Sequence, residues 1–432
     1  MTIKLAKLLF LAFVVSIPLA RPLNFNVFGQ TLQFSEAFFI LSAIFWICAI
    51  IRRETRVYLD PGFIFIAVYI GALGLSAFFS IAPLRSFVKL AGVIYLAAIC
   101  FLAYNLCRDT HFLRKVIAGW VLATAIVIIG SFLGIGLFYA GYRSIANNYF
   151  LSHFGSLPSG NYPRVHSFFA NANMMCNYLN VSLMLTIAVR HLYRRFRPLM
   201  LAVQVSTWIA AIFTFSVGLG GMIFSSALWS YQQLQQKKRK VLATVLISAG
   251  AIMAGTILAT ALVSPDTPNT DQNFSVAGKG LEPSVRVLIW QNTLKTIAEH
   301  PLTGVGVGND PVRFKYTTLS GDEQLLADAH NIWLNVTAQA GLPGLIAILA
   351  LSFYLYQRCR FAVDNESSEN STILPAVSCA LAGAFFYQGL TGSYEDARHL
   401  WLLFGILFAV SRAKPETDLP AGSGSLQNHP AT

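Results

Sequence analysis

The chain has 432 residues, of which 55% are hydrophobic and 12% are charged, and its mean hydropathy is +0.58. Soluble globular proteins carry about 25% charged residues, so this chain lacks much of the polar surface that would keep it in water. Its apolar residues come in runs of about 17–25, the length that spans the hydrocarbon core of a bilayer. Composition therefore excludes a soluble enzyme, a nucleic-acid-binding protein and a secreted disulfide scaffold, and it predicts an all-α, polytopic membrane protein.

The hydropathy pattern predicts about twelve transmembrane helices. The first apolar run follows a basic N-terminus and is similar to a secretory signal, but no small-x-small cleavage site precedes Arg21, so we expect it to remain as the first helix. The expected spans are residues 5–20, 34–51, 62–80, 88–106, 115–137, 173–190, 198–215, 217–234, 241–263, 331–355, 372–391 and 399–411. Residues 412–432 are polar and predict a disordered cytoplasmic tail.

The basic residues predict how the chain is oriented. With the N-terminus in the cytoplasm, roughly two thirds of the 31 Lys and Arg residues fall on the cytoplasmic side, as the positive-inside rule requires. Both termini are then cytoplasmic. The chain divides into residues 1–263, which carry spans one to nine and an outward loop at about 138–172, a large outward loop at 264–330, and spans ten to twelve at 331–411. Loops of this length are usually functional, so we expect the chemistry to face the outside.

One amphipathic helix is expected within the large outward loop. Ser284 can cap its start and Pro301 ends it. Its apolar stripe consists of Val287, Trp290, Leu294 and Ile297. Such a helix lies on the membrane surface or against the bundle. Arg286, one turn before Trp290, is then at the headgroup level, where a guanidinium either binds a lipid phosphate bidentately or snorkels to water.

The next segment, PLTGVGVGNDPVRFKY, contains Gly304, Gly306 and Gly308. These glycines neither follow a buried strand nor open a long apolar helix, so they do not predict a dinucleotide-binding loop. We expect a tight turn instead, which brings back toward the membrane the side chains of Arg313, Lys315 and Tyr316.

Polar and small residues mark the start of span ten. A polar stripe is formed by Asn331, Asn335 and Gln339, and a neighbouring face, whose small residues allow close helix packing, by His330, Thr337, Gly341 and Gly344. Polar side chains at membrane depth usually face a cavity or a partner. From the residues alone, His330 is either a structural interfacial histidine or a catalytic one.

Three stretches of the loop belong together as a motif: Arg286-x3-Trp290, Pro301-Leu302-x-Gly304-Val305-Gly306 and His330-Asn331-x9-Gly341-x2-Gly344. Together they resemble the O-antigen ligase/polymerase superfamily of bacterial envelope glycosyltransferases. The last is similar to the signature of the lipid A-core O-antigen ligase, a His and a polar residue followed by nine others and Gly-x-x-Gly. The hydropathy layout, with twelve spans and one large late periplasmic loop, fits the same family and a GT-C-like fold.

A fourth stretch, residues 164–173, is similar to the family's Arg-x-x-Gly-x-Phe-x-Asn-Pro-Asn pattern. Two positions depart from it, because Ser167 replaces the glycine and Ala172 replaces the proline. The family also often has Ser-Arg at the outer end of a later span. The corresponding stretch here, residues 214–217, contains no arginine, so another residue must supply that charge.

The resemblance implies a glycan donor on undecaprenyl diphosphate and a lipid A-core acceptor, both at the periplasmic face of the bacterial inner membrane. Cations must hold the diphosphate leaving group, and a base must take a proton from the attacking hydroxyl. An imidazole with an ordinary pKa near 6.5 is suited to that role at pH 7. We expect His330 to be the base and Arg286 the main diphosphate clamp, with inversion at the anomeric carbon. Arg164 is expected to be a second clamp or a residue that positions the donor.

No cofactor or metal is expected. The outward loops lack an Asp-x-Asp pattern or a carboxylate cage, and the six cysteines show neither Cys-x-x-Cys nor zinc-ligand spacing. Arginines would supply the charge that a divalent metal could otherwise provide. The remaining candidates for binding substrate or phosphate are the outward residues Arg85, Lys89, Arg143, Arg313, Lys315, Tyr316, Asn331 and Arg398.

Alternative functions stay open. An O-antigen polymerase uses the same donor with a second lipid-linked glycan as acceptor, and a protein O-oligosaccharyltransferase modifies Ser or Thr of a protein. A transporter of lipid or solute would also have twelve spans, but it should show ionisable groups buried mid-span or paired interrupted helices.

Overall fold

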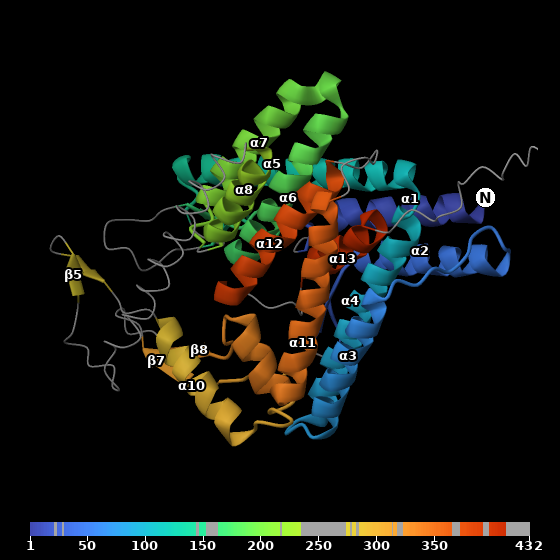
Figure 1. The fold of residues 1–432 in the computed structure, drawn as a ribbon. Coiled ribbons are helices and arrows are strands. Elements are labelled where there is room, and N and C mark those ends of the chain that lie inside the picture. The colour runs from blue at the N-terminus through green and yellow to red at the C-terminus, as the bar shows by residue number, and fades with distance from the viewer. Residues whose placement is uncertain are drawn as a thin grey trace, which may run out of the picture.

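The structure is a computed structural model of the whole chain. It describes residues 1–20, 24–27, 30–143, 147–152, 163–216, 218–234, 274–276, 279–281, 285–312, 314–317, 323–364, 372–391 and 397–411. Helices dominate these residues and pack into a bundle, with the helix of the late loop lying at one end of it (Figure 1). The predicted all-α class is confirmed.

Every predicted span except the ninth coincides with a helix. The helices are α1 (Thr2–Ser16), α2 (Phe34–Ile51), α3 (Gly62–Phe78), α4 (Pro83–Cys107), α5 (Thr110–Tyr139), α6 (Ala172–Leu192), α7 (Arg197–Ile212), α8 (Leu219–Gln233), α11 (Ile332–Asp364), α12 (Ile373–Thr391) and α13 (Arg398–Val410). The ninth expected span, residues 241–263, and the tail lie outside the described residues. The amphipathic helix expected in the large loop is α10 (Val285–Glu299), and a short 3-10 helix, Arg194–Phe196, joins α6 to α7.

The described strands form two-stranded antiparallel hairpins within the loops, which the sequence did not predict. These hairpins are β1 (Asn24–Val27) with β2 (Gln30–Gln33), β3 (Leu151–Ser152) with β4 (Arg164–Val165), β5 (Phe274–Val276) with β6 (Lys279–Leu281), and β7 (Phe314–Thr317) with β8 (Glu323–Leu326). They were missed because strands of two to four residues are too short to show an alternating apolar pattern.

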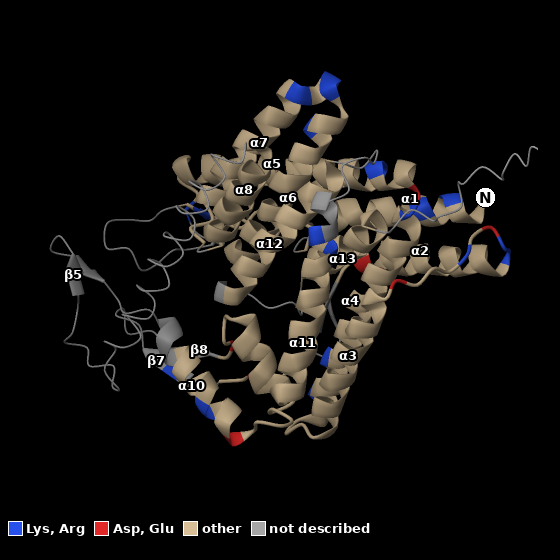
Figure 2. Cartoon of the chain, viewed as in Figure 1, with Lys and Arg blue, Asp and Glu red and all other residues tan. Residues whose placement is uncertain are grey.

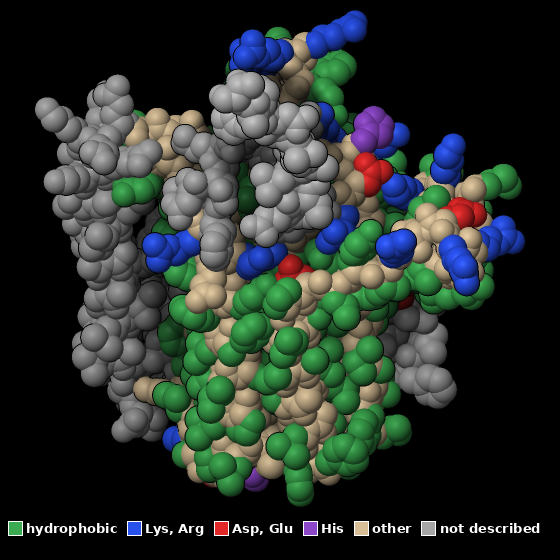
Figure 3. All heavy atoms as spheres, turned by 45° about the vertical axis from the view of Figure 1, so that its right-hand side comes forward, with side chains coloured by type: hydrophobic (Ala, Val, Ile, Leu, Met, Phe, Trp, Pro, Cys, Tyr) green, Lys and Arg blue, Asp and Glu red, His purple; other side chains and the backbone are tan. Residues whose placement is uncertain are grey.

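Five described helices are long and apolar enough to cross a membrane by their length and composition, namely α2, α4, α5, α6 and α11. Shorter apolar helices are α3, α12 and α13. Lys and Arg residues gather at the α6–α7 turn and near the start of α1 (Figure 2). One broad face of the molecule is almost entirely hydrophobic and is bordered by a row of Lys and Arg (Figure 3). These features are those of a polytopic membrane protein.

The bundle interior depends on small residues that let helices approach closely. A Cβ atom on Gly221 of α8 would lie 2.4 Å from the carbonyl oxygen of Gly383 on α12, so both positions need glycine. The Ser225 hydroxyl donates to Oδ1 of Asn180 (2.7 Å), and the Asn180 amide donates to the Ala380 carbonyl (3.3 Å). Close backbone approach and polar bonds between helices are the usual means of holding α-helices together in a membrane.

The start of α5 is tied to α1 by one carboxylate. Asp109 is the N-cap of α5, and its Oδ1 accepts the backbone N–H groups of His111 and Phe112. Its Oδ2 lies 2.6 Å from Nζ of Lys7 in α1. Burial alone would raise the pKa of Asp109, but the Lys7 ammonium and the two backbone N–H groups outweigh it, so the pKa lies below its ordinary value of 3.8.

Replacing Asp109 should therefore destabilise the protein in a pH-dependent way. We expect Asp109→Ala to lower the free energy of unfolding by about 1 kcal/mol, the usual value of an N-cap, and Asp109→Asn to cost less because the amide oxygen still caps the helix. Since the folded pKa is depressed, the stabilisation is complete above about pH 4 and is lost as the pH falls further. Thermal unfolding in detergent at pH 7 and pH 3 measures this. An equal difference from wild type at both pH values would contradict it.

Candidate active site

The helix α11 is broken near its start. Gly341 has φ +65° and ψ −167°, which ends one helical arm, Ile332–Ala340, and a second arm follows from residue 342. The arms fold back on each other, because a Cβ atom on Gly344 would lie 2.5 Å from Cβ of Ala340 (Figure 1). Pro343 suits the first turn of the second arm. The helix expected over residues 331–355 is therefore interrupted at Gly341, which the sequence did not predict.

A break of this kind leaves backbone groups without helical partners, and the loop of residues 301–310 supplies them. The N–H groups of Val305 and Gly306 donate to the carbonyls of Ala338 and Gln339 (2.9 and 3.0 Å), which end the first arm. The N–H of Leu342, which begins the second arm, donates to the carbonyl of Pro301 (2.8 Å). The 301–310 loop is thus the cap of both arms.

Glycine is required where this loop crosses α11. A Cβ atom on Gly304 would lie 2.3 Å from the carbonyl carbon of Gln339, and one on Gly341 would lie 2.4 Å from the carbonyl of Leu302. Asn309 then fixes the far end of the loop by donating to Oγ of Ser80 (2.8 Å), in the turn between α3 and α4. The glycine-rich stretch and the Gly-x-x-Gly stretch of the motif are therefore two sides of one packing contact.

Because of this contact, a substitution at Gly341 tests the arrangement directly. We expect Gly341→Ala to lower the free energy of unfolding by at least about 2 kcal/mol, because the new Cβ meets backbone atoms and the left-handed conformation disfavours alanine. Gly71→Ala is a matched control, since Gly71 lies in the middle of α3 and a Cβ atom added there would meet nothing within 4 Å. The control should be neutral or slightly stabilising. Thermal unfolding in detergent compares them, and an unchanged Tm for Gly341→Ala would be the contrary result.

The segment 328–331 leads into the first arm and is held on both sides. The backbone N–H of His330 donates to Oδ1 of Asp328 (2.9 Å), and the indole N–H of Trp290 on α10 donates to the carbonyl of Ala329 (2.9 Å). His330 itself has φ +49°, a left-handed conformation that is uncommon for a residue other than glycine or asparagine. Such a conformation persists only where the surroundings enforce it.

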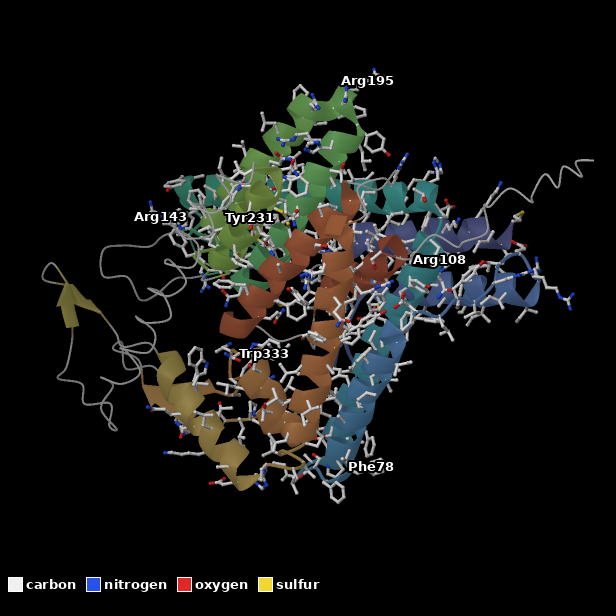
Figure 4. The ribbon with its side chains drawn as sticks, in the orientation of Figure 1. Phe78, Arg108, Arg143, Arg195, Tyr231 and Trp333 are labelled. Carbon is white, nitrogen blue, oxygen red and sulfur yellow. The ribbon has the colours of Figure 1, made fainter. Side chains whose placement is uncertain are left out.

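Asn331 ties the same segment to α12. Its Oδ1 accepts the backbone N–H groups of Trp333 and Leu334 (3.0 and 3.2 Å), which makes it the N-cap of the first arm. Its amide nitrogen donates to the carbonyl of Gly389 (2.6 Å), near the end of α12. Figure 4 shows Trp333 at the end of the first arm that faces α12. The Asn331 amide, predicted to bind substrate, is thus engaged by the protein at both of its polar atoms.

The His330 imidazole is the side chain of this segment that the fold leaves available. Among the described residues it makes no hydrogen bond, and its nearest charged neighbour is Asp328, whose Oδ2 lies 3.9 Å from Nδ1. Its side chain is 38% exposed. An imidazole that is held in place through its backbone, and whose ring is open to solvent, is what a general base requires.

Arg286 belongs to the helix that fixes this segment. It lies in the first turn of α10, one turn before Trp290, whose indole bonds to Ala329. The side chain of Arg286 lies outside the described residues. The predicted apolar stripe of α10 is only partly right, because Ile289 and Thr293 are buried whereas Leu294 is 54% exposed. The helix rests against α11 by that buried face.

Arg164 lies in a second region, against the turn between α7 and α8. Its Nε donates to the carbonyl of Thr214 (3.0 Å), and a terminal nitrogen donates to Oδ1 of Asn173 at the start of α6 (3.3 Å). The backbone N–H of Val165 donates to the carbonyl of Phe213 (2.9 Å). The stretch at residues 214–217, where the family pattern has an arginine that this chain lacks, is therefore in direct contact with the Arg164 guanidinium.

Ser167 and His166 give this region its shape. Ser167 has φ +50°, which explains why the family pattern has glycine here, and its hydroxyl compensates by donating to the carbonyl of Val127 (2.9 Å). His166 is buried, with Nδ1 and Nε2 each 3.0 Å from a carbonyl oxygen, those of Ser167 and Leu151. His166 is thus a structural residue rather than a base.

Both regions meet the last turns of α12. Gly218, which follows the α7–α8 turn, packs so closely on Tyr387 that a Cβ atom there would lie 2.5 Å from the ring. Asn331 bonds to Gly389, two residues further along α12. The α7–α8 turn that Arg164 contacts and the segment that carries His330 therefore lie at the same end of α12.

The other predicted cations fall into separate places. Arg85 pairs with Asp310 (2.8 Å), and Lys89 packs beside Gly308, so both lie at the 301–310 loop. Lys315 is exposed on β7, where it is opposite Leu325. Arg313 and the side chain of Tyr316 lie outside the described residues.

Two further predicted cations contact other parts of the bundle. Arg143 lies over the ring of Phe138, with 5.4 Å between its guanidinium carbon and the ring centroid, and Figure 4 shows it well apart from Trp333. Arg398 forms an ion pair with Glu36 and so joins α13 to α2. The structure does not bring either of these arginines to His330.

Sequence reasoning missed Asp328 and the anchoring role of Trp290. The signal for Asp328 was its position two residues before His330, because Asp accepts a backbone N–H at that spacing and stabilises a turn. No group of three or more His, Cys, Asp or Glu side chains with the spacing to hold a metal ion occurs within the described part of the chain.

Comparison with known families agrees with the motif. A family model described as O-antigen ligase matches residues 179–349, a stretch that contains the Arg286–Trp290 pair, the 301–310 loop and the His330–Gly344 motif. The resemblance to the O-antigen ligase/polymerase superfamily is thereby confirmed. The family and the membrane helices together indicate a multi-pass bacterial membrane protein of glycosyltransferase type. No curated protein matches the chain.

Proposed function

We propose that this protein is an O-antigen ligase, which transfers glycan from undecaprenyl diphosphate to a sugar hydroxyl of lipid A-core. The proposal places it in the bacterial inner membrane, with both termini in the cytoplasm and the site facing the periplasm. The single observation that carries it is the 328–331 segment, which is fixed by α10 and α12 and leaves one open imidazole within the region that the family model matches.

The proposed reaction needs one general base and cations that bind the diphosphate. The acceptor hydroxyl oxygen attacks the anomeric carbon of the donor, its proton passes to the His330 imidazole, and the bond from the anomeric carbon to the diphosphate oxygen breaks. The electron pair leaves with the diphosphate. Attack from the face opposite the leaving group inverts the anomeric carbon. Cations that contact the diphosphate lower the barrier because its charge grows in the transition state.

Arg286 is proposed as the main clamp because it begins α10, the helix whose Trp290 holds Ala329 beside His330. A helix N-terminus adds its own attraction for a phosphate. Arg164 is proposed as the second clamp, since it occupies the region where the family pattern has an arginine at residues 214–217. With arginines supplying the positive charge, the reaction is proposed to proceed without a divalent metal.

The remaining cations are proposed to contact phosphates of the donor, of lipid A or of membrane lipids. They are Arg85, Lys89, Arg143, Arg313 and Lys315, with Tyr316 beside them in sequence. For Asn331 we propose that it acts by positioning the backbone of His330, because its side chain already caps α11 and bonds to Gly389.

The break in helix α11 helps to distinguish an enzyme from a transporter, the alternative function considered above. In transporters the free backbone groups of broken helices face a cavity and bind substrate or ions. Here the groups freed at Gly341 are bonded to the 301–310 loop. The break thus serves to place a loop on the bundle, which favours an enzyme.

His330 provides the direct test. We expect His330→Ala to reduce transfer to lipid A-core by about 10²–10⁴-fold, the usual contribution of a general base. The assay uses membranes, undecaprenyl diphosphate-linked glycan, lipid A-core and EDTA, and wild-type transfer should continue in EDTA. His300→Ala, at an exposed histidine just after α10, is the matched control and should be fully active.

The same assay separates the alternatives. Transfer that survives His330→Ala removes His330 as the base. Growth of the lipid-linked glycan without transfer to lipid A-core identifies a polymerase, and glycan on a pilin-like acceptor protein identifies a protein O-oligosaccharyltransferase. Loss of transfer in EDTA that added divalent metal restores overturns the metal-independent mechanism.

A second prediction concerns the clamp. Arg286→Lys keeps the charge but loses the planar fork that binds two phosphate oxygens, so we expect a loss in kcat/KM of roughly tenfold, and Arg286→Ala to lose more. Lys295→Ala, at an exposed cation on the same helix, should leave kcat/KM unchanged. Initial rates at varied donor concentration measure both. If Lys295→Ala and Arg286→Ala behave alike, Arg286 binds no diphosphate.

A further inference from the structure

Asp328 is the charged side chain nearest to the His330 imidazole among the described residues. One carboxylate oxygen, Oδ1, accepts the backbone N–H of His330 at 2.9 Å, and the other, Oδ2, lies 3.9 Å from Nδ1 of its ring. The side chains are 47% and 38% exposed. One carboxylate therefore contacts both the backbone and the ring of the same histidine.

The backbone contact keeps the carboxylate in place. A short acidic side chain that accepts the N–H two residues later stabilises a turn, and here the turn carries His330 into its left-handed conformation. Ala329, between them, is bonded to Trp290, and Asn331 is bonded to Gly389. Because the segment is fixed on both sides, Oδ2 stays near Nδ1, and 38% of the His330 side chain remains exposed.

We propose that Asp328 is the positioning residue of His330, an inference that rests on the proposed function. In the complex with its substrates, the 3.9 Å separation closes so that Nδ1–H donates to Oδ2, which leaves the lone pair of Nε2 for the acceptor hydroxyl. When that hydroxyl attacks, its proton moves to Nε2, the glycosidic bond forms and the diphosphate leaves with its electron pair. The ring is then an imidazolium, and the carboxylate stabilises that charge without itself taking a proton.

Other charges near the segment act differently. The helix α10 contributes Arg286 in the turn before Trp290, and Lys295 and Glu299 toward its far end. The first arm of α11 and the whole of α12 carry no charged residue. Of the described carboxylates, Asp328 is the one within 4.0 Å of the His330 ring, so it is the one placed to position that ring.

The two contacts of Asp328 can be separated by substitution. Asp328→Asn keeps an oxygen that accepts the His330 N–H but removes the negative charge beside Nδ1. Asp328→Ala removes both contacts, and Asp328→Glu restores the charge at a longer reach. Glu299→Gln is the matched control, since Glu299 is an exposed carboxylate at the end of α10 in the same loop.

The test is transfer to lipid A-core by these variants, with kcat and KM measured separately and their Tm in detergent as a measure of folding. We expect Asp328→Asn to lower kcat by roughly tenfold while KM for the donor and the Tm are unchanged, because the turn is kept and only the charge beside Nδ1 is lost. Asp328→Ala should lose more, Asp328→Glu should recover part of the loss, and Glu299→Gln should match wild type.

The opposite results are equally clear. If Asp328→Asn has the wild-type kcat, or if Asp328→Glu recovers none of the loss, the carboxylate serves the turn alone and the proposal is overturned. His330→Ala in the same assay tests the proposed function separately. Wild-type transfer by His330→Ala overturns the base itself, whereas an inactive His330→Ala with a fully active Asp328→Asn overturns only the role of Asp328.

Discussion

The break in α11 at Gly341 is the constraint on which the site depends. A helix that reverses next to a membrane leaves carbonyl and N–H groups that neither lipid nor an adjacent turn can satisfy, and each unsatisfied group is costly. The 301–310 loop satisfies them, and it can do so only because Gly304 and Gly341 allow two backbones to touch. The loop is therefore bound to the bundle, and the helix α10 before it is brought beside the first arm of α11.

This fixed arrangement determines the position of His330 and the exposure of its ring. Trp290 bonds to the residue before it, and the residue after it, Asn331, bonds to Gly389 of α12, so the imidazole is positioned by contacts of its neighbours and its ring is left open. A base whose ring is not used to hold the fold can take and release a proton without loosening the structure. Asn331 is polar because its one side chain makes two hydrogen-bonding contacts: it caps the first arm of α11 and bonds to the Gly389 carbonyl of α12.

The sequence predicted the helices well because each is encoded by a long apolar run, and it predicted α10 from its capping residue and the proline that ends it. The prediction that Arg286 and His330 form one site came only from the motif. The sequence could not predict the break, because a glycine in an apolar helix is equally suited to close packing and to a left-handed turn. The contact of Arg164 with Thr214 joins residues fifty positions apart, and no local pattern encodes such a contact. Asp328 was overlooked because a lone acidic residue in a polar loop has no periodicity to mark it.

The proposed mechanism requires the donor diphosphate to sit between the first turn of α10 and the open edge of the His330 ring. The decisive experiment is the structure of the protein in lipid nanodiscs with bound undecaprenyl diphosphate, determined by electron cryomicroscopy. We expect diphosphate density in contact with the Arg286 guanidinium, with the His330 ring facing the space beside it. Diphosphate density held at Arg85 and Lys89 instead, with His330 turned away from it, would rule this mechanism out.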